Sequence, residues 1–369
     1  MFTAVRSVEP ILLDKILAGQ NSGRAGQGLA FRSCSNDSRR VGEGDLFIAI
    51  RGSEHDGHDF IEEAIRRGCC AVVAERPMEG LSVPVCVVPD TRKAFGRICQ
   101  AIAGNPAQKL NLVGVTGTNG KTTTTCLIAR IFSESGQKTG LVGTLGGFDG
   151  EEFYETKLTT PSADEMAGWL SRMVNHDCGG AVLEVSSHAM QQQRLSGINF
   201  NSVCITNITR DHLDYHGTID SYRASKFRLL NQLNDDGVAV LNADDPLSAE
   251  MLPRIQHPVL TIGIQNDASI CGIPIERCLS EQTFLLTAGS ETIPVRTRMI
   301  GDHHIYNCLT AAAVGLASGI ELTTIVRAIE SLDYLPGRLE RIDCGQAFNV
   351  YVDFAHSPDA LRACLSTLK

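Results

Sequence analysis

The sequence has no apolar run close to the roughly 20 residues that a membrane-spanning helix needs. It also has no excess of basic residues, since 33 Lys and Arg stand against 42 Asp and Glu, a formal net charge of −9. General nucleic-acid binders are more often basic, so neither a membrane nor nucleic acid is an expected partner. Internal repeats and low-complexity tracts are absent as well. Residues 1–19 include two acidic side chains and no signal-peptide core, and we therefore expect a cytoplasmic protein. We also expect the protein to be a monomer.

The 13 cysteines are odd in number and include no C-x-x-C pair. Most lie in apolar runs such as SVCITN and GRICQAIAG, and the adjacent Cys69 and Cys70 cannot easily share a bridge. A buried reduced thiol behaves as a small hydrophobic side chain. The pattern therefore indicates free, buried cysteines, and not a disulfide framework or a metal site.

The length of 369 residues is too great for one ordinary core and suggests two or three domains. Residues 1–108 alternate short apolar runs with helical stretches, which predicts a small α/β domain that ends near the linker-like segment GNPAQKL at 104–110. Residues 109–334 contain near-continuous apolar strands between helical patterns. This pattern is typical of a doubly wound, mostly parallel sheet with helices on both faces.

The end of the second region and the third region differ in pattern. Residues 270–300 alternate as strands without helices, which indicates an antiparallel appendage, and helices are predicted at 303–317 and 321–332. The third region, 335–369, has two short strand-like runs and a helix that starts near Pro358. Its 35 residues are too few for a stable domain, so we expect it to be the start of an incomplete C-terminal domain.

The segment LVGVTGTNGKTTTT, at 112–125, predicts a strand, a glycine-rich turn and a helix. Gly117 and Gly120 let backbone N–H groups approach phosphates, and the helix N-terminus favours their negative charge. Lys121 is then placed for the β- and γ-phosphates and the Thr122 hydroxyl for Mg²⁺. The general pattern has glycine where this chain has Val115, but the strand, loop, lysine and threonine are present. The segment predicts a nucleoside triphosphate site.

Two further predicted strands end in polar residues. GAVLEVSSH ends with Glu184, and SVCITN runs into ITRDHLDYHG, which contains His212. Ligands of open α/β sheets bind beyond the carboxyl ends of the strands, so Thr122, Glu184 and His212 are expected in one crevice. Together with phosphate oxygens they form a reasonable Mg²⁺ environment. Zinc is disfavoured because His212 and His216 of DHLDYH, although four residues apart, lack the general base that directly follows the first histidine of the H-E-x-x-H zinc pattern.

Taken together, these motifs and several others resemble the Mur ligases of peptidoglycan synthesis, most closely the MurE branch. The segments that carry the resemblance are NDSRRVGEGDLFIAIRGSEHDGH (36–58), GTNGKTT (117–123), LTTP (158–161), EVSSHAMQQQR (184–194), TNITRDHLDYHG (206–217), SYRASKF (221–227), LPGRLE (335–340) and VDFAHSPDAL (352–361). Folylpolyglutamate synthetases share the GTNGK loop but not the DHLDYHG block. MurF ligases share the N-terminal features but not SSHAM or DHLDYHG.

The resemblance implies a reaction of UDP-N-acetylmuramoyl-L-alanyl-D-glutamate with ATP and an amino acid, meso-diaminopimelate or L-lysine, through an acyl phosphate. The implied ATP-binding residues are Gly117, Thr118, Asn119, Gly120, Lys121, Thr122 and Thr123, with Asn307 at the adenine, Arg338 at the phosphates and Asp353 at the ribose. The implied UDP-sugar residues are Asn36, Ser38, Ser53, Glu54 and His55, and the muramoyl-dipeptide residues are Thr159, Thr160, Ser186, Gln192 and Arg194. The catalytic residues implied are Lys121, Glu184, His212 and Lys226, and the Mg²⁺ ligands are Thr122, Glu184, His212 and Lys226.

Lys226 matches a lysine that the family carboxylates with CO₂. An ammonium beside Mg²⁺ would be repelled, whereas a carbamate brings negative charge and oxygen ligands. Capture of CO₂ needs the neutral amine, so a desolvated, cationic surrounding favours the modification. Considered without the upstream motif, by contrast, the lysine of YRASKFRLL would be an ordinary solvated residue of a helix.

One residue departs from the family pattern. The family commonly has Asn three residues before Asn307, and GDHHIYN has His304 there, while His356 matches the C-terminal motif. Two other functions stay open at this point: a folylpolyglutamate-type ligase, and a non-catalytic fragment that binds UDP-muramoyl-dipeptide and ATP. The DSR and DGH segments near the N-terminus, which resemble a UDP-sugar domain, disfavour the first.

Overall fold

The computed structural model describes residues 7, 9–17 and 28–369, and it divides into two compact units. Unit 1 is Met1–Lys109, Pro161–Asn175 and Gln191–Ile198, and unit 2 is Leu110–Thr160, His176–Met190 and Asn199–Lys369. Part of the N-terminal stretch in which we found no signal-peptide core lies outside the described residues. Within the ranges that are described, no helix is long and apolar enough to cross a membrane.

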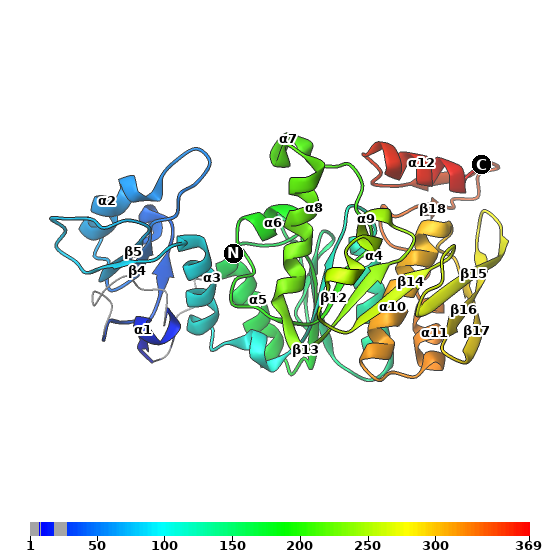
Figure 1. Cartoon of the computed structure of the whole chain (residues 1–369), viewed down its shortest axis with the longest axis horizontal. Coiled ribbons are helices and arrows are strands. Elements are labelled where there is room, and N and C mark those ends of the chain that lie inside the picture. Colours follow the sequence, from blue (N-terminus) through cyan, green and yellow to red (C-terminus); the bar gives the residue numbers. More distant parts are fainter. Residues whose placement is uncertain (1–6, 8, 18–27) are drawn as a thin grey trace. The chain divides into compact units, whose positions relative to one another are not determined.

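Unit 1 is built on a four-stranded parallel sheet with the strand order β3-β4-β5-β6. Its described elements are β1 (Ile11–Leu12), α1 (Leu13–Ile16), β2 (Ala30–Phe31), β3 (Cys34–Ser35), η1 (Ser38–Arg40), β4 (Leu46–Ile48), η2 (Gly57–Phe60), α2 (Ile61–Arg66), β5 (Ala71–Ala74), β6 (Val85–Val87), α3 (Thr91–Ile102), η3 (Pro106–Lys109) and α5 (Ala163–Asn175). The small α/β pattern predicted from the first hundred residues is present (Figure 1).

Both faces of the unit 1 sheet are covered, which explains why its strands are apolar without alternation. Leu46, Ile48 and Val73 face one core, which α3 completes, while Phe47 and Val72 face the other. Parallel strands buried on both faces read as continuous hydrophobic runs. Helix α5, distant in sequence, joins the first of these cores through Ala163 and Ala167, and this packing makes it part of unit 1.

Unit 2 contains an 11-stranded sheet with the order β10-β9-β8-β11-β7-β12-β13-β14-β15-β16-β17. Its strands are β7 (Asn111–Thr116), β8 (Thr139–Gly143), β9 (Gly146–Phe148), β10 (Phe153–Tyr154), β11 (Gly180–Glu184), β12 (Phe200–Ile205), β13 (Leu233–Asn242), β14 (Val259–Gly263), β15 (Ile270–Arg277), β16 (Gln282–Ala288) and β17 (Glu291–Thr297). The strands β8, β11, β7, β12, β13, β14 and β15 pair in parallel, as the sequence predicted, and β9, β10, β16 and β17 pair antiparallel at the two ends.

The predicted antiparallel appendage is an extension of the same sheet. β15 pairs in parallel with β14, through Ile262 with Ile270 and Gly263 with Cys271, before β16 and β17 turn back on it. The antiparallel pairing was therefore predicted correctly. The hydrogen bonds between β14 and β15 make this appendage continuous with the main sheet.

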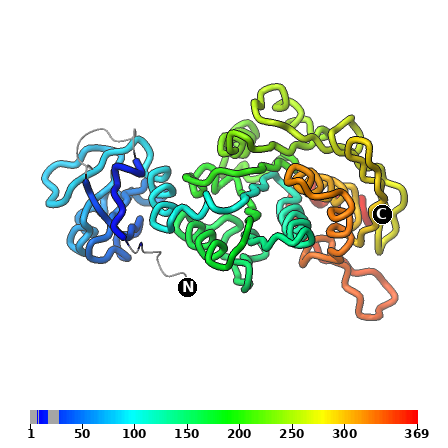
Figure 2. The backbone as a smooth tube through the Cα atoms, turned by 90° about the horizontal axis from the view of Figure 1, so that it is seen from below, coloured from blue at the N-terminus to red at the C-terminus, as the bar shows by residue number. Residues whose placement is uncertain are grey.

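The helices of unit 2 cover this sheet and carry the loops at its edge. They are α4 (Lys121–Glu134), α6 (Ser187–Gln191), α7 (Leu213–His216), α8 (Ile219–Phe227), η4 (Arg228–Gln232), α9 (Pro246–Ala249), η5 (Leu252–Arg254), α10 (Asp302–Ala317), α11 (Leu322–Glu330) and α12 (Pro358–Thr367). α10 and α11 pack against α4 (Figure 1 and Figure 2). The core between them includes Ile128, Leu309 and Ile325, all fully buried.

The order of strands places a switch point at β7. The chain passes from β7 to β8 on one side, inserts β11 between them, and then continues on the other side of β7 with β12. At such a point, the loops that follow neighbouring strands turn to opposite sides of the sheet. They leave a crevice at the carboxyl ends of the strands, where ligands of such sheets bind. The loops after β7, β11 and β12 contain the motifs of the sequence, so the topology brings these motifs to one edge.

The C-terminal segment belongs to unit 2. β18 (Glu340–Ile342) and β19 (Val350–Val352) form an antiparallel pair, and α12 follows. The Ser357 hydroxyl caps α12 by accepting from the backbone N–H of Ala360, and Pro358 occupies the first turn, as predicted.

Candidate active site

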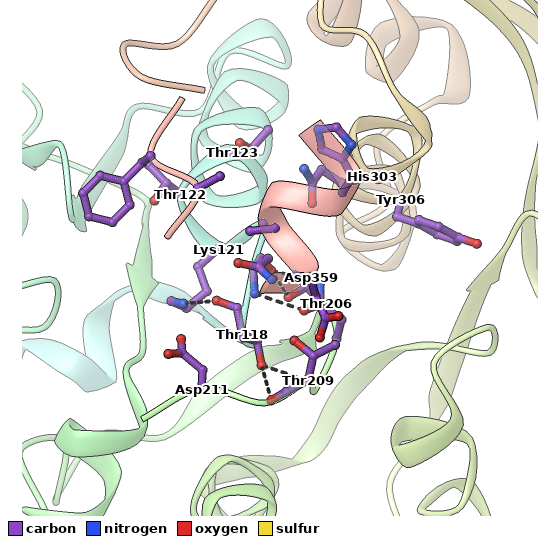
Figure 3. A pocket seen from close by; sticks show the side chains of 18 of the residues that line it. Thr118, Lys121, Thr122, Thr123, Thr206, Thr209, Asp211, His303, Tyr306 and Asp359 are labelled. Carbon is purple, nitrogen blue, oxygen red and sulfur yellow. Dashed lines mark hydrogen bonds between the residues drawn. The ribbon is translucent and has the colours of Figure 1, made fainter. Parts of the chain in front are cut away.

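A cavity of about 590 Å³ opens at the carboxyl edge of the unit 2 sheet. The predicted site residues in its lining are Thr118, Asn119, Gly120, Lys121, Thr122, Thr123, Thr159, Ser186, His212, Lys226, Asn307, Arg338 and Asp353, and His356 lines it as well. Figure 3 shows Thr118, Lys121, Thr122 and Asp211 together in this cavity. Thr122 and His212, which the sequence predicts to share one crevice with Glu184, both line this cavity.

The glycine-rich turn between β7 and α4 has a backbone that only glycine fits. Gly117 has φ +149° and Gly120 has φ +84°. A Cβ at Gly117 would lie 1.9 Å from Thr206 Oγ1, and one at Gly120 would lie 2.3 Å from Asn307 Oδ1. α4 begins directly after, at Lys121, so its free N–H groups face the cavity. Val115 lies one residue before the end of β7, fully buried in the core, where glycine is not needed.

The turn is held by the segment that follows β12. Thr118 N–H donates to Asn207 O at 2.8 Å, and Asn119 N–H donates to Asn207 Oδ1 at 3.0 Å. The Thr206 hydroxyl donates to Asn119 O at 2.6 Å. The turn is therefore preorganised, since its peptide groups are fixed from both sides before any ligand binds.

Two lysines converge on this turn. Lys121 Nζ donates to Gly117 O and to Thr118 O, each at 2.9 Å, and Lys226 Nζ donates to Gly117 O at 2.7 Å. Lys226 is only 2% exposed. Its burial, and next the charge of Lys121, lower the pKa of Lys226 well below its ordinary value. Burial lowers the pKa of Lys121 too, while Glu184 opposes that shift. A buried lysine with a lowered pKa is thus located at the position that the family resemblance assigns to a carboxylated lysine.

Glu184 lies at the end of β11, beneath the turn. Its carboxylate accepts hydrogen bonds from the Thr122 hydroxyl at 3.2 Å and from the Thr144 N–H and hydroxyl at 2.9 and 3.0 Å. The guanidinium of Arg338 donates to Thr122 Oγ1 at 2.7 Å. Glu184 itself lies outside the cavity lining and is 1% exposed. The sequence analysis missed Thr144. This residue directly follows β8, and it could have been found in the same way as Glu184, as a polar residue at the carboxyl end of a strand.

The donor set of Thr122 and Glu184 fits Mg²⁺, because a hydroxyl and a buried carboxylate are hard oxygen ligands. In the part of the chain that the structure describes, no three His, Cys, Asp or Glu side chains are grouped to hold a metal ion by themselves. Phosphate oxygens and water would therefore have to complete the coordination of an ion at this place.

His212 belongs to a group of aromatic side chains around α7. Its ring lies 4.9 Å from that of His188, and its Nε2 lies 3.5 Å from Asp211 Oδ2. His216 contacts the Ser187 hydroxyl through Nε2 at 2.9 Å, and burial lowers the pKa of His216. This group brings α6 and the start of α7 together at the carboxyl ends of β11 and β12.

Tyr222 is a further residue of the site that the sequence reasoning missed. It is fully buried, and its hydroxyl lies 3.0 Å from Thr118 Oγ1. Its ring lies 4.7 Å from Lys226 Nζ, one turn along α8. Burial raises the pKa of Tyr222, so its hydroxyl stays protonated. The only available signal was its position four residues before Lys226 on a predicted helix.

The predicted nucleotide residues outside the turn come from α10 and the C-terminal segment. Asn307 Oδ1 accepts from the Thr124 hydroxyl at 3.3 Å. The carboxylate of Asp353 accepts hydrogen bonds from the N–H groups of Leu339 and Ala355, at 2.7 and 2.8 Å. The first of these bonds fixes the backbone directly after Arg338. Figure 3 shows His303 and Tyr306 of α10 at this cavity together with Asp359 of α12.

The predicted substrate residues are divided between the units. Thr159, Thr160 and Ser186 belong to unit 2. Thr160 is fully buried, where its hydroxyl donates to Glu184 O at 2.7 Å and accepts from Ser186 N–H at 3.0 Å. The others belong to unit 1: Asn36, Ser38, Ser53, Glu54, His55, Gln192 and Arg194.

Within unit 1, the two groups of predicted substrate residues have their own local contacts. The Ser38 hydroxyl donates to Glu63, and Arg194 donates to Gln192 Oε1 at 2.7 Å. The segment 53–55 is an exposed loop closed by the hydrogen bond from Gly52 N–H to His55 O. The loop 53–55 is therefore exposed, whereas Ser38, Gln192 and Arg194 are paired with other side chains of unit 1.

Two family models match the chain. The one described as "Mur ligase middle domain" matches residues 115–315, and "Mur ligase family, catalytic domain" matches residues 31–102. A curated relative from Geobacillus thermodenitrificans, UDP-N-acetylmuramoyl-L-alanyl-D-glutamate--2,6-diaminopimelate ligase, is 41% identical over 339 residues, which are 90% of this chain and 69% of the relative. A relative of the same name from Halalkalibacterium halodurans is 42% identical over 335 residues, with the same shares covered.

Solved structures of Mur ligases and of a related synthase also match the chain. A structure titled as the diaminopimelate ligase superposes with a TM-score of 0.81 at 30% identity and covers 98% of this chain and 74% of its own. MurF from Acinetobacter baumannii gives 0.68 at 24% identity, with 98% and 76% covered. Mycobacterium tuberculosis folylpolyglutamate synthase gives 0.63 at 21% identity, with 75% and 70% covered, and these last two show a shared fold alone.

Proposed function

The chain belongs to the Mur ligase family and is an ATP-dependent ligase, and on that premise we propose that it joins 2,6-diaminopimelate to UDP-N-acetylmuramoyl-L-alanyl-D-glutamate. The choice of this amino acid over L-lysine is supported by the names of the relatives. The observation that carries the proposal is the single cavity in which the phosphate-binding turn, Lys226 and Arg338 meet. The reaction belongs to peptidoglycan synthesis, and we place it in the cytoplasm.

The reaction proceeds in two steps that balance without any further reactant. The free carboxylate of the glutamyl residue attacks the γ-phosphorus of ATP, the bond to the β-phosphate oxygen breaks, and ADP leaves. The amine of the incoming amino acid then attacks the acyl phosphate, loses a proton, and expels inorganic phosphate. Each step moves negative charge onto oxygens that fixed positive groups can stabilise.

The residues of the phosphate-binding turn have distinct roles in this scheme. Lys121 leaves the carbonyls of Gly117 and Thr118 to neutralise the β- and γ-phosphates. Arg338, which contacts the Thr122 hydroxyl, adds a second cation at the phosphates. Thr122, Glu184 and His212 would hold Mg²⁺, which when bound would withdraw charge from the phosphate oxygens. Asn307 and Asp353 orient the rest of the nucleotide.

Lys226 is carboxylated in this proposal. Its neutral amine attacks CO₂, forming an N–C bond and releasing one proton, so that a carbamate with one negative charge results. Burial and the neighbouring Lys121 lower the pKa of Lys226, which favours the neutral amine that this attack needs. The carbamate would then be an anionic partner for Lys121, and it would be one of the oxygen groups that hold Mg²⁺.

The remaining residues extend the proposal over three domains. Residues 1–108 bind the UDP-sugar through Asn36, Ser38 and the loop 53–55, residues 109–334 bind ATP, and 335–369 open a C-terminal domain. The muramoyl-dipeptide contacts Thr159, Thr160, Ser186, Gln192 and Arg194. Hydroxyl, amide and guanidinium groups of this type suit a substrate with carboxylates and amides.

The test is phosphate release from the purified chain, with ATP and Mg²⁺, in the presence of UDP-muramoyl-dipeptide and one of two amino acids. We expect release with diaminopimelate, and little with L-lysine or without the dipeptide. Release with a folate and glutamate, and none with the dipeptide, would overturn the proposal in favour of a folylpolyglutamate-type ligase. Binding of the dipeptide without any release would instead identify a non-catalytic protein.

A further inference from the structure

Unit 1 contains a buried histidine whose two ring nitrogens both have a partner, directly after the loop 53–55. His58, in η2, is 5% exposed. Its Nδ1 lies 2.6 Å from Asp56 Oδ1, and its Nε2 lies 3.0 Å from the backbone nitrogen of Glu75. Glu75 directly follows β5, an inner strand of the sheet. The ring of His58 therefore joins the end of this strand to Asp56.

The contact with Glu75 determines the tautomer of His58. A backbone N–H can only donate, so Nε2 is the accepting nitrogen, and the proton of the ring is then on Nδ1. Nδ1–H donates to the carboxylate of Asp56. The backbone N–H of His58, and next its ring, lower the pKa of Asp56, which keeps this acceptor ionised. The ring is thus a link with one hydrogen bond at each end, and the bond to the ionised carboxylate is of the stronger kind.

Asp56 in turn forms the base of the loop that carries the segment 53–55. It pairs with Arg51 as an isolated antiparallel bridge. The neighbouring Gly57 N–H donates to Ile50 O at 2.9 Å. The segment 53–55 is exposed, so burial does not hold it in place. The base of the loop therefore has to set the position of this segment, and His58 connects the base to the sheet.

We propose that His58 is a positioning residue for the UDP-sugar, because it holds Asp56, and through Asp56 the segment 53–55, in the conformation that receives this ligand. The inference rests on the proposed function, which assigns the UDP-sugar to this loop, and deepens it by naming a residue that acts through another. When a loop populates its binding conformation only in part, the apparent affinity falls by that fraction. Loss of the link weakens binding of this substrate alone, since the nucleotide cavity belongs to unit 2.

The experiment compares the wild type with two variants of His58 in the full chain. His58→Phe keeps the shape of the ring and loses both hydrogen bonds, and His58→Asn carries an amide N–H that replaces Nδ1–H. Calorimetry gives the Kd for UDP-muramoyl-dipeptide and for AMP-PNP, a non-hydrolysable ATP analogue, and thermal scanning gives the Tm. Asp56→Ala, alone and combined with His58→Phe, completes a double-mutant cycle.

Thr91→Val is the matched control in the same part of unit 1. Thr91 is fully buried, and its hydroxyl donates to the Glu75 carboxylate at 2.9 Å. The variant therefore loses a buried hydrogen bond near His58 and leaves the contact between His58 and Asp56 in place. It separates a general loss of stability in unit 1 from a change in the loop.

We expect the Kd of His58→Phe for UDP-muramoyl-dipeptide to rise about tenfold, as the loss of a hydrogen bond to an ionised group predicts. Its Kd for AMP-PNP should match the wild type, and in phosphate release its KM for the dipeptide should rise while kcat is unchanged. His58→Asn should restore part of the affinity, and Thr91→Val should lower the Tm without changing either Kd. The double variant should bind no more weakly than the weaker of its two single variants.

An unchanged Kd of His58→Phe for UDP-muramoyl-dipeptide would overturn the inference. So would an equal loss of affinity in Thr91→Val, or losses in His58→Phe and Asp56→Ala that add up in the double variant. If His58→Phe does not fold, Asp56→Ala decides, and wild-type affinity in that variant overturns the inference. A wild type that does not bind UDP-muramoyl-dipeptide contradicts the proposed function and this inference with it. Wild-type binding that neither variant weakens overturns the inference alone.

Discussion

Lys121 and Lys226 donate hydrogen bonds to the same acceptor, the carbonyl oxygen of Gly117, at 2.9 and 2.7 Å. Two ammonium groups that share one acceptor repel each other, and the burial of Lys226 removes the water that would screen them. The pair therefore favours a neutral amine on Lys226. This relationship connects the phosphate-binding turn to α8 and is the physical basis of two of the predictions below.

Replacement of Lys121 by Ala is expected to abolish ligase activity. The change removes the charge that balances the β- and γ-phosphates, and kcat/KM for ATP should fall on the order of 10²–10³-fold or more, as when a preorganised stabilising group is lost. Steady-state phosphate release measures this. Lys109→Ala, an exposed lysine of η3, is the control. Near-normal ATP turnover in Lys121→Ala would contradict the role of the turn.

Replacement of Lys226 by Ala is expected to remove most of the activity, and added formate or acetate should partly restore it by occupying the anionic position of the carbamate. Lys226→Glu should retain a fraction of the activity, although its carboxylate reaches less far. Carbonyl NMR with ¹³C-bicarbonate near neutral pH detects the carbamate directly. An unmodified amine in fully active enzyme, with bicarbonate present, would refute the modification.

The pH dependence of stability should reveal the buried amine of Lys226. Its pKa in the folded state is lowered from 10.5, so between the lowered value and 10.5 the unfolded chain binds more protons. The free energy of unfolding is thus highest above pH 10.5, and it falls as the pH drops from 10.5 toward the folded pKa of Lys226. In CO₂-free buffer, the unfolding free energy of the wild type should rise relative to Lys226→Met between pH 7 and 10. A constant difference across this range would contradict a lowered pKa, and the exposed Lys109→Met should follow the wild type.

Gly120 and Gly136 provide a matched pair, because their φ angles are +84° and +85° at the two ends of α4. Gly136→Ala should cost about 1–2 kcal/mol in unfolding free energy from the left-handed backbone alone, since a Cβ there meets nothing within 4 Å. Gly120→Ala should cost more and also weaken nucleotide binding, because its Cβ displaces Asn307. Urea unfolding and calorimetry measure both. Equal losses for the two variants would show that the close approach of Asn307 is unimportant.

Much of the fold could be predicted from local patterns. The strands of both units were recognised because parallel strands buried on two faces are apolar throughout, as in β5 and β11. The start of α12 at Pro358 was predicted from its first-turn preference. The continuity of β14 with β15 was missed, because two pairs of residues in register carry no signal in the sequence of either strand.

By itself, the sequence determined the phosphate-binding turn, the strand ends that carry Glu184 and His212, and the family resemblance. These depend on contiguous residues, whose backbone requirements are local: glycine where φ is positive, and a helix that starts directly after the turn. Only the tertiary structure decided that Lys226 reaches Gly117 from 109 residues away, and that Arg338 reaches Thr122 from 216. It also decided that His304 is buried without a partner. Burial and charge proximity are sums over all neighbours, and neighbours are set by the order of strands in the sheet, which no single segment of the chain contains.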